Sequence, residues 1–94
     1  MTLADIAHVA LAEALAADAH PVTLTVRPCR IDLVVRDHRV IVEIRRGILR
    51  VVWVVLPVGM EQATSDERVA LDDADTGVVG AMVRRAVDAG LTPF

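Results

Sequence analysis

The side chains that could act as nucleophiles, bases or metal ligands are few and scattered along the chain. There are three histidines, His8, His20 and His38, and one cysteine, Cys29. None of them has the short spacing to another histidine or cysteine that a metal-binding pair needs. Arginines flank Cys29, and positive charge favours a reactive thiolate, but a nucleophile also needs a positioned base and no histidine is implied as its partner. We therefore interpret the histidines as surface residues and Cys29 as an ordinary turn residue.

An acidic segment, "DDADTG" at 72–77, has the composition of a calcium loop without its spacing. With Asp73 and Asp75 as the first and third ligands, the fifth position is Gly77, which has no ligating side chain. These acids are better explained as charges at the positive end of a helix. The chain also lacks a phosphate-binding glycine loop and a Gly-x-Ser-x-Gly motif. The sequence therefore predicts a protein that is not an enzyme, with no catalytic residues, no metal ligands and no cofactor.

Arginine is the remaining residue type with binding chemistry, because its guanidinium group pairs with carboxylates and phosphates. All ten basic residues are arginines. Residues 21–56 hold seven of them against three acidic residues, residues 57–94 hold three against seven, and the formal net charge of the chain is -3. The arginines are thus concentrated in one segment without making the whole chain basic. They form either a site for an anion or the solvated side of a sheet.

Length and composition describe one globular domain. The 94 residues, 54% hydrophobic and 24% charged, suffice for a single core, so we assign residues 1–94 to one domain. No apolar run reaches the roughly 20 residues of a membrane-spanning helix, and we expect neither a signal peptide nor a membrane contact. One cysteine cannot form an internal disulfide, so a reducing cytoplasm is the expected location. The absence of Lys, Asn and Tyr favours a GC-rich bacterium or one of its phages as the source.

Two segments have helical periodicity. Residues 2–18 carry an apolar stripe at helical spacing, and Thr2 with Asp5 resembles a capping box in which Asp replaces Glu. A second helix is predicted from about Thr76 to Ala89, with acidic residues before it and Gly90 closing it.

The segment before the second helix, residues 57–74, is acidic and predicted to be irregular. One short turn of helix is predicted near residues 65–71, because Thr64 and Glu67 have the spacing of a capping box.

Residues 22–55 alternate between apolar and mostly polar side chains, which predicts four strands. Two-residue turns are expected at Pro28-Cys29, Asp37-His38 and Arg46-Gly47. These turns place Val34 opposite Ile41 and Ile41 opposite Val52, and they keep all the apolar positions on one face. The predicted fold class is α+β, with an N-terminal helix, a four-stranded antiparallel meander and a C-terminal helix. Both helices cover the apolar face, and the other face stays open.

The open face of this predicted sheet supports three interpretations. An adjacent apolar group in the middle of an uncovered sheet indicates a contact. This favours a non-catalytic protein-interaction module that forms a homodimer, with a second protein partner as an open alternative. The predicted interface residues are Val34, Ile41, Val52 and Val54. The face is alternatively only solvated, with its arginines neutralised by Asp32 and Glu43. The third interpretation is an anion or nucleic-acid site formed by Arg27, Arg30, Arg36, Arg39, Arg45 and Arg50.

Nucleic acid is the less favoured ligand, because sheets that bind single strands offer aromatic side chains on which bases stack. Tyr is absent, and the parity of the strand places Trp53 on the core face. We therefore expect a small accessory or regulatory protein that acts through protein contact, with anion binding as the alternative.

Overall fold

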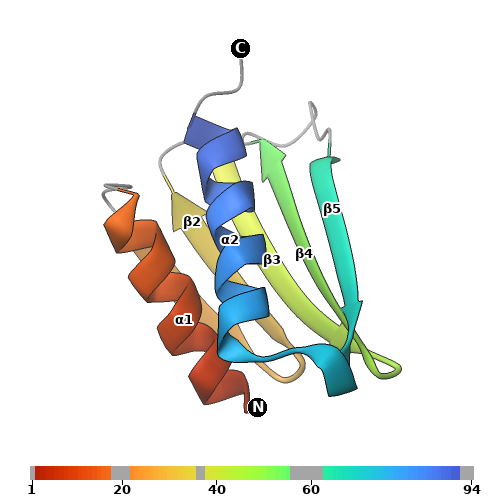
Figure 1. The fold of residues 1–94 in the computed structure, drawn as a ribbon. Helices are drawn as coiled ribbons and strands as arrows, with labels where there is room; N and C mark the ends of the chain where they lie inside the picture. Colours follow the sequence, from red (N-terminus) through yellow and green to blue (C-terminus); the bar gives the residue numbers. More distant parts are fainter. Residues whose placement is uncertain (1, 18–21, 36–37, 56–62, 92–94) are drawn as a thin grey trace.

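Two helices pack on one face of a five-stranded antiparallel sheet in which each strand pairs with its neighbour in the sequence (Figure 1). This arrangement comes from a computed structural model that describes residues 2–17, 22–35, 38–55 and 63–91. The elements are α1 (Leu3–Ala16), β1 (Val22–Arg27), β2 (Arg30–Val35), β3 (His38–Arg45), β4 (Ile48–Val55), β5 (Ala63–Ala70), a single 3-10 turn (Leu71–Asp73) and α2 (Thr76–Leu91). The predicted α+β class and the antiparallel meander are confirmed.

The start of α1 has the predicted capping box. The Asp5 amide donates to the Thr2 hydroxyl oxygen at 3.2 Å, and the Thr2 amide donates to the Asp5 carboxylate at 3.0 Å. These two bonds satisfy amide groups that the first turn of a helix leaves without an intrahelical acceptor. They also hold the pKa of Asp5 below its usual value, chiefly through the bond from the Thr2 amide.

Two hairpin turns use backbone conformations that most residues avoid. In the β3–β4 turn, Arg46 and Gly47 both have positive φ, 53° and 75°, as a type I′ turn requires. In the β1–β2 turn, Cys29 has a φ of 63° and follows Pro28, whose ring fixes a negative φ; this is the sign pattern of a type II turn. Cys29 and Arg46 therefore stand where glycine or asparagine is favoured.

The predicted pairing of β2 with β3 is wrong by two residues. Val35 pairs with His38, which puts Val34 opposite Arg39 and Asp32 opposite Ile41. The other two predicted registers are confirmed, with Thr23 opposite Val34 and Ile41 opposite Val52. A shift of two residues keeps every side chain on its predicted face, because side chains alternate with a period of two. It changes the cross-strand neighbours and leaves the predicted apolar core positions on their face.

Residues 63–70 form a fifth strand where an irregular segment with a turn of helix was predicted. β5 pairs antiparallel with β4, with a register irregularity between Trp53 and Val54. Thr64 and Glu67, which resembled a capping box, lie in this strand, and Glu67 instead accepts hydrogen bonds from Arg85 of α2 at 2.7–3.1 Å. The sequence did not predict this strand, because an edge strand has few neighbours that exclude water. Its sequence therefore lacks the apolar alternation of a central strand.

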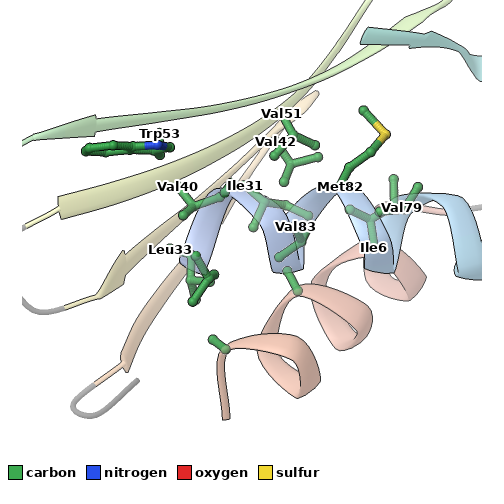
Figure 2. Close-up of a cluster of buried hydrophobic side chains, with 14 of the residues drawn as sticks. Ile6, Ile31, Leu33, Val40, Val42, Val51, Trp53, Val79, Met82 and Val83 are labelled. Atoms are coloured by element: carbon green, nitrogen blue, oxygen red, sulfur yellow. The ribbon is translucent and has the colours of Figure 1, made fainter. Parts of the chain in front are cut away.

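Both helices pack against the same face of the sheet, as predicted. α1 lies over β1 and β2, and α2 lies over β3, β4 and β5 and beside α1 (Figure 1). The side chains between these layers form one core (Figure 2), and the parity prediction is confirmed because its members include Leu33, Val42, Val51, Trp53, Val79 and Val83. Cover is incomplete at one edge, where Val26 of β1 points toward the helix side of the sheet but is 53% exposed.

His38 is a core residue, contrary to its interpretation as a surface residue in a turn. It begins β3 on the same face as Val40, is 1% exposed, and packs edge-on against Trp53 with ring centroids 5.7 Å apart. Gly90 lies against its ring, so closely that a β-carbon there would overlap the imidazole. Gly90 was expected to close α2, but the helix continues to Leu91. The glycine is needed for close packing.

Candidate interaction surface on the open sheet face

The sheet face opposite α1 and α2, called here the open face, is organised in four rows of side chains that run across the strands. The register places their members as follows. The Arg39 row contains Thr23, Val34, Arg39 and Val54; the central row Thr25, Asp32, Ile41, Val52 and Asp66; the Glu43 row Arg27, Arg30, Glu43, Arg50 and Arg68; and the hairpin row Arg45, Ile48 and Ala70.

The predicted interface residues are together on this face, in a different pattern from the one expected. Ile41 and Val52 are directly opposite each other in the central row, while Val34 and Val54 flank Arg39 in the row beside it. Val34, Ile41 and Val54 are half-buried and Val52 is 7% exposed. The four side chains therefore form an apolar cluster around one arginine rather than one continuous apolar row.

Acidic side chains on the open face are held by neighbouring arginines. Arg30 donates from Nε and Nη2 to the Asp32 carboxylate at 2.6 and 3.3 Å, and Asp32 is only 7% exposed. Arg50 makes a two-point contact with Asp66 at 2.9 and 2.8 Å and also reaches Glu43 at 3.4 Å. These hydrogen bonds lower the pKa of Asp66 to about 2, with the largest effect from Arg50 and a smaller one from Arg68.

The arginines predicted to bind an anion do not act as one group. Arg30 and Arg50 are engaged with acids on the same face, and Arg36 lies outside the described residues. Arg27, Arg39 and Arg45 form no ion pair with an acid in the described part of the chain, but they lie in three different rows. Only part of the predicted arginine set is available to a ligand.

Arg39 differs from the other arginines of the open face. It is half-buried between Val34 and Val54, and its Nε is shielded from water without a hydrogen-bond acceptor among the described residues. A buried donor that lacks an acceptor costs about 1–3 kcal/mol, and more when the group is charged. Arg39 is thus a charged side chain inside the apolar cluster, and the described residues of one chain supply no acceptor for its Nε.

A pocket of about 340 Å³ lies at the β3–β4 hairpin end of the open face. We call it the hairpin pocket, and its lining residues are Glu43, Arg45, Arg46, Ile48, Arg50 and Arg68. Two of these arginines were absent from the predicted set. Arg46 belongs to a turn, and Arg68 lies on the strand that was predicted to be irregular. A signal for Arg68 was present in the alternation Asp66, Arg68, Ala70 against Glu67 and Val69, but it is weak without apolar residues on both sides.

The histidines and the cysteine are placed on separate elements. His8 is exposed on α1, Cys29 is exposed in the β1–β2 turn, and His38 is in the core; His20 lies outside the described residues. No group of three or more His, Cys, Asp or Glu side chains is arranged to hold a metal ion in the segments that the structure describes. Neither described helix combines the length and apolarity needed to cross a membrane.

Comparison with protein-family models, with curated proteins and with solved structures found no match to this chain.

Proposed function

We propose that this protein is a non-catalytic interaction module that forms a homodimer through its open face. The observation that carries the proposal is the apolar cluster of Val34, Ile41, Val52 and Val54 surrounding Arg39, whose Nε lacks an acceptor within the described residues. An apolar group in the middle of a face that neither described helix covers favours a macromolecular contact. A half-buried guanidinium group at its centre favours a contact that brings a carboxylate.

A second copy of the chain offers that carboxylate. Consider two open faces packed together about a two-fold axis that runs across the strands along the central row. The axis places the central row on itself, so that Ile41 and Val52 meet their equivalents. It also places the Arg39 row on the Glu43 row, because these rows flank the central row on either side. Arg39 and Glu43 come from the same strand, so the side chain of Arg39 lies over Glu43 of the second copy, twice in each dimer.

The dimensions of the sheet set the expected strength of this dimer. Five strands at about 4.8 Å spacing, with up to eight residues at about 3.3 Å rise, give a face of roughly 24 by 26 Å. Two such faces bury at most roughly 1,200 Å² in total when they overlap completely, which is at the lower edge of specific interfaces. We therefore expect dissociation in the micromolar range rather than an obligate dimer.

The charge pairing can be tested by mixing two variants. Arg39→Glu alone places glutamate against glutamate, and Glu43→Arg alone places arginine against arginine, so each variant should be monomeric. Mixed in equal amounts, they should form a heterodimer, because both contacts again join opposite charges. Sedimentation velocity at several micromolar concentrations would measure this. Three results would refute the proposed geometry: a monomeric wild type, single variants that dimerise like the wild type, or two monomeric variants whose mixture stays monomeric.

Substitution of the apolar cluster provides a second test. Ile41→Asp should yield a folded monomer, because it would bury an unpaired charge in the contact while leaving the core intact. Val78→Asp is the matched control, since Val78 is exposed on α2, away from the open face. This control should dimerise like the wild type.

The non-catalytic role and the location are parts of the same proposal. The positions of His8, Cys29 and His38 on separate elements support a role without catalysis. The chain's one cysteine, Cys29, is exposed and free, which favours the reducing cytoplasm of a GC-rich bacterium or the host of its phage.

A further inference from the structure

We propose that the hairpin pocket binds a small phosphorylated molecule, with its phosphate on Arg45 and Arg46 and its apolar part against Ile48. This inference goes beyond the proposed homodimer, because one copy of the chain supplies every lining residue of the pocket. Glu43 and Arg50 belong to both proposals, whereas Arg45, Arg46 and Ile48 lie beyond the three rows that the dimer pairs. Its volume of about 340 Å³ is at the small end of the range for small-molecule sites, about 300–1,000 Å³.

The charges of the hairpin pocket leave an excess of two positive charges. Four arginines and Glu43 line it, and Asp66 bridges Arg50 and Arg68 at 2.8–3.4 Å. These two acids neutralise the equivalent of two arginines. Arg45 and Arg46 form no ion pair with an acid among the described residues, so they are available to a ligand. A phosphate monoester carries close to two negative charges at pH 7 and three strong acceptor oxygens, which matches this excess.

The backbone that carries Arg45 and Arg46 is anchored on both sides. The Ile44 amide donates to the Cys29 carbonyl oxygen at 2.9 Å, which ties β3 to the neighbouring β1–β2 turn. The Leu71 amide donates to the Gly47 carbonyl oxygen at 2.8 Å, which ties the β3–β4 turn to the end of β5. Two guanidinium groups held on a fixed backbone lose less freedom when a ligand binds than groups on a loose loop would.

Arg46 occupies a turn position that other residues would fill at lower conformational cost. Its φ of 53° is in the left-handed region, where a type I′ turn favours asparagine or glycine. An outlying backbone conformation retained by a charged residue is compatible with a binding role. It also supplies a useful variant, since Arg46→Asn removes the guanidinium group while favouring the turn.

The apolar wall of the pocket distinguishes a small organic phosphate from a free phosphate ion. Ile48 is 41% exposed at the pocket and pairs with Arg45 across the hairpin. An extended nucleic acid fits less well, because Arg50 in the pocket is already paired with Glu43 and Asp66, and Arg30 outside it is paired with Asp32. No continuous track of available arginines crosses the described part of the face.

The test is titration calorimetry with AMP, inorganic phosphate and adenosine at about 50 mM salt, with a 20-nucleotide single-stranded DNA for comparison. AMP should bind, inorganic phosphate should bind more weakly, and adenosine should not bind detectably. Arg46→Asn should weaken AMP binding by about tenfold or more, the usual effect of losing one charge-assisted hydrogen bond. Arg27→Gln is the control, because it removes one exposed arginine of the same face outside the pocket. It should change AMP affinity by less than about threefold.

Three outcomes would overturn the proposal. The first is the absence of AMP binding at millimolar concentration by a wild type that is folded by circular dichroism. The second is an equal loss in Arg46→Asn and Arg27→Gln, which would indicate non-specific attraction. The third is DNA binding tighter than AMP binding and weakened by Arg27→Gln, which would indicate an extended nucleic-acid surface. Equal affinities of the wild type for AMP and inorganic phosphate would remove the role of Ile48, as would an Ile48→Thr variant with unchanged AMP affinity.

Discussion

Replacing Gly90 with alanine should destabilise this protein, although alanine is the better helix former. A methyl group at Gly90 would overlap the ring of His38, which is 1% exposed and packed edge-on against Trp53. Overpacking of a filled core costs about 1–3 kcal/mol. Alanine returns at most about 1 kcal/mol through helix propensity, and less near a helix end. The net loss in the free energy of unfolding should be about 1–2 kcal/mol. In a domain of this size, each kcal/mol lowers the melting temperature by roughly 4–8 °C.

Two companion variants separate the steric cause from a general effect of glycine. Gly77 lies exposed in the first turn of α2, where an added β-carbon would meet only the Asp75 carboxylate at 3.3 Å. Gly77→Ala should therefore leave stability unchanged or raise it by up to about 1 kcal/mol. In a His38→Val background, which removes the ring, Gly90→Ala should no longer destabilise. Urea denaturation of the wild type, Gly90→Ala, Gly77→Ala, His38→Val and the His38→Val/Gly90→Ala double variant would measure this. An undiminished cost of Gly90→Ala in the His38→Val background would refute the explanation.

Two further predictions concern the Asp66 ion pairs and the β1–β2 turn. The folded-state pKa of Asp66 is lowered from 3.8 to about 2, so its stabilisation is present above pH 4 and is lost as the pH falls toward 2. Because the side chain is 34% exposed, solvent screening limits this stabilisation to about 1 kcal/mol. The urea midpoint of Asp66→Asn should therefore fall less than that of the wild type as the pH is lowered from about 4 to 2. An acid dependence identical to that of the wild type would contradict the assignment. Cys29→Asn should raise the free energy of unfolding by about 0.5–1 kcal/mol, because asparagine tolerates the φ of 63° better than cysteine; a lower melting temperature in differential scanning calorimetry would contradict this.

The class of fold and the identity of the core residues could be predicted from local patterns. Alternation along residues 22–55 assigns Leu33, Val42, Val51 and Trp53 to one face, and all four are buried. The prediction is robust because an error of one residue would invert a whole strand, whereas an error of two leaves each face unchanged. The capping pair Thr2 and Asp5 was also predictable, since its two hydrogen bonds join residues three positions apart.

The pairing partners on the open face were decided by the tertiary structure. Parity alone cannot distinguish registers that differ by two residues, so Val34 was expected beside Ile41 and lies beside Arg39 instead. β5 was also missed by pattern analysis, because its alternation is weak and its polar residues favour a strand only when β4 is beside it. Without β5, neither the Arg50–Asp66 contact nor the contribution of Arg68 to the hairpin pocket could be foreseen.

The sequence by itself determined which side chains face the core and which face outward, since that follows from the two-residue repeat of an extended backbone. The tertiary structure decided which outward side chains meet. His38 was predicted to be in a turn and became a core residue because the β2–β3 register brings it into β3, where α2 accommodates its ring at Gly90. Arg39 was one of six arginines predicted to bind an anion and became distinct because the same register places it between Val34 and Val54. The physical reason is that the facing of a side chain depends on local backbone geometry, whereas its neighbours depend on contacts between residues distant in the chain.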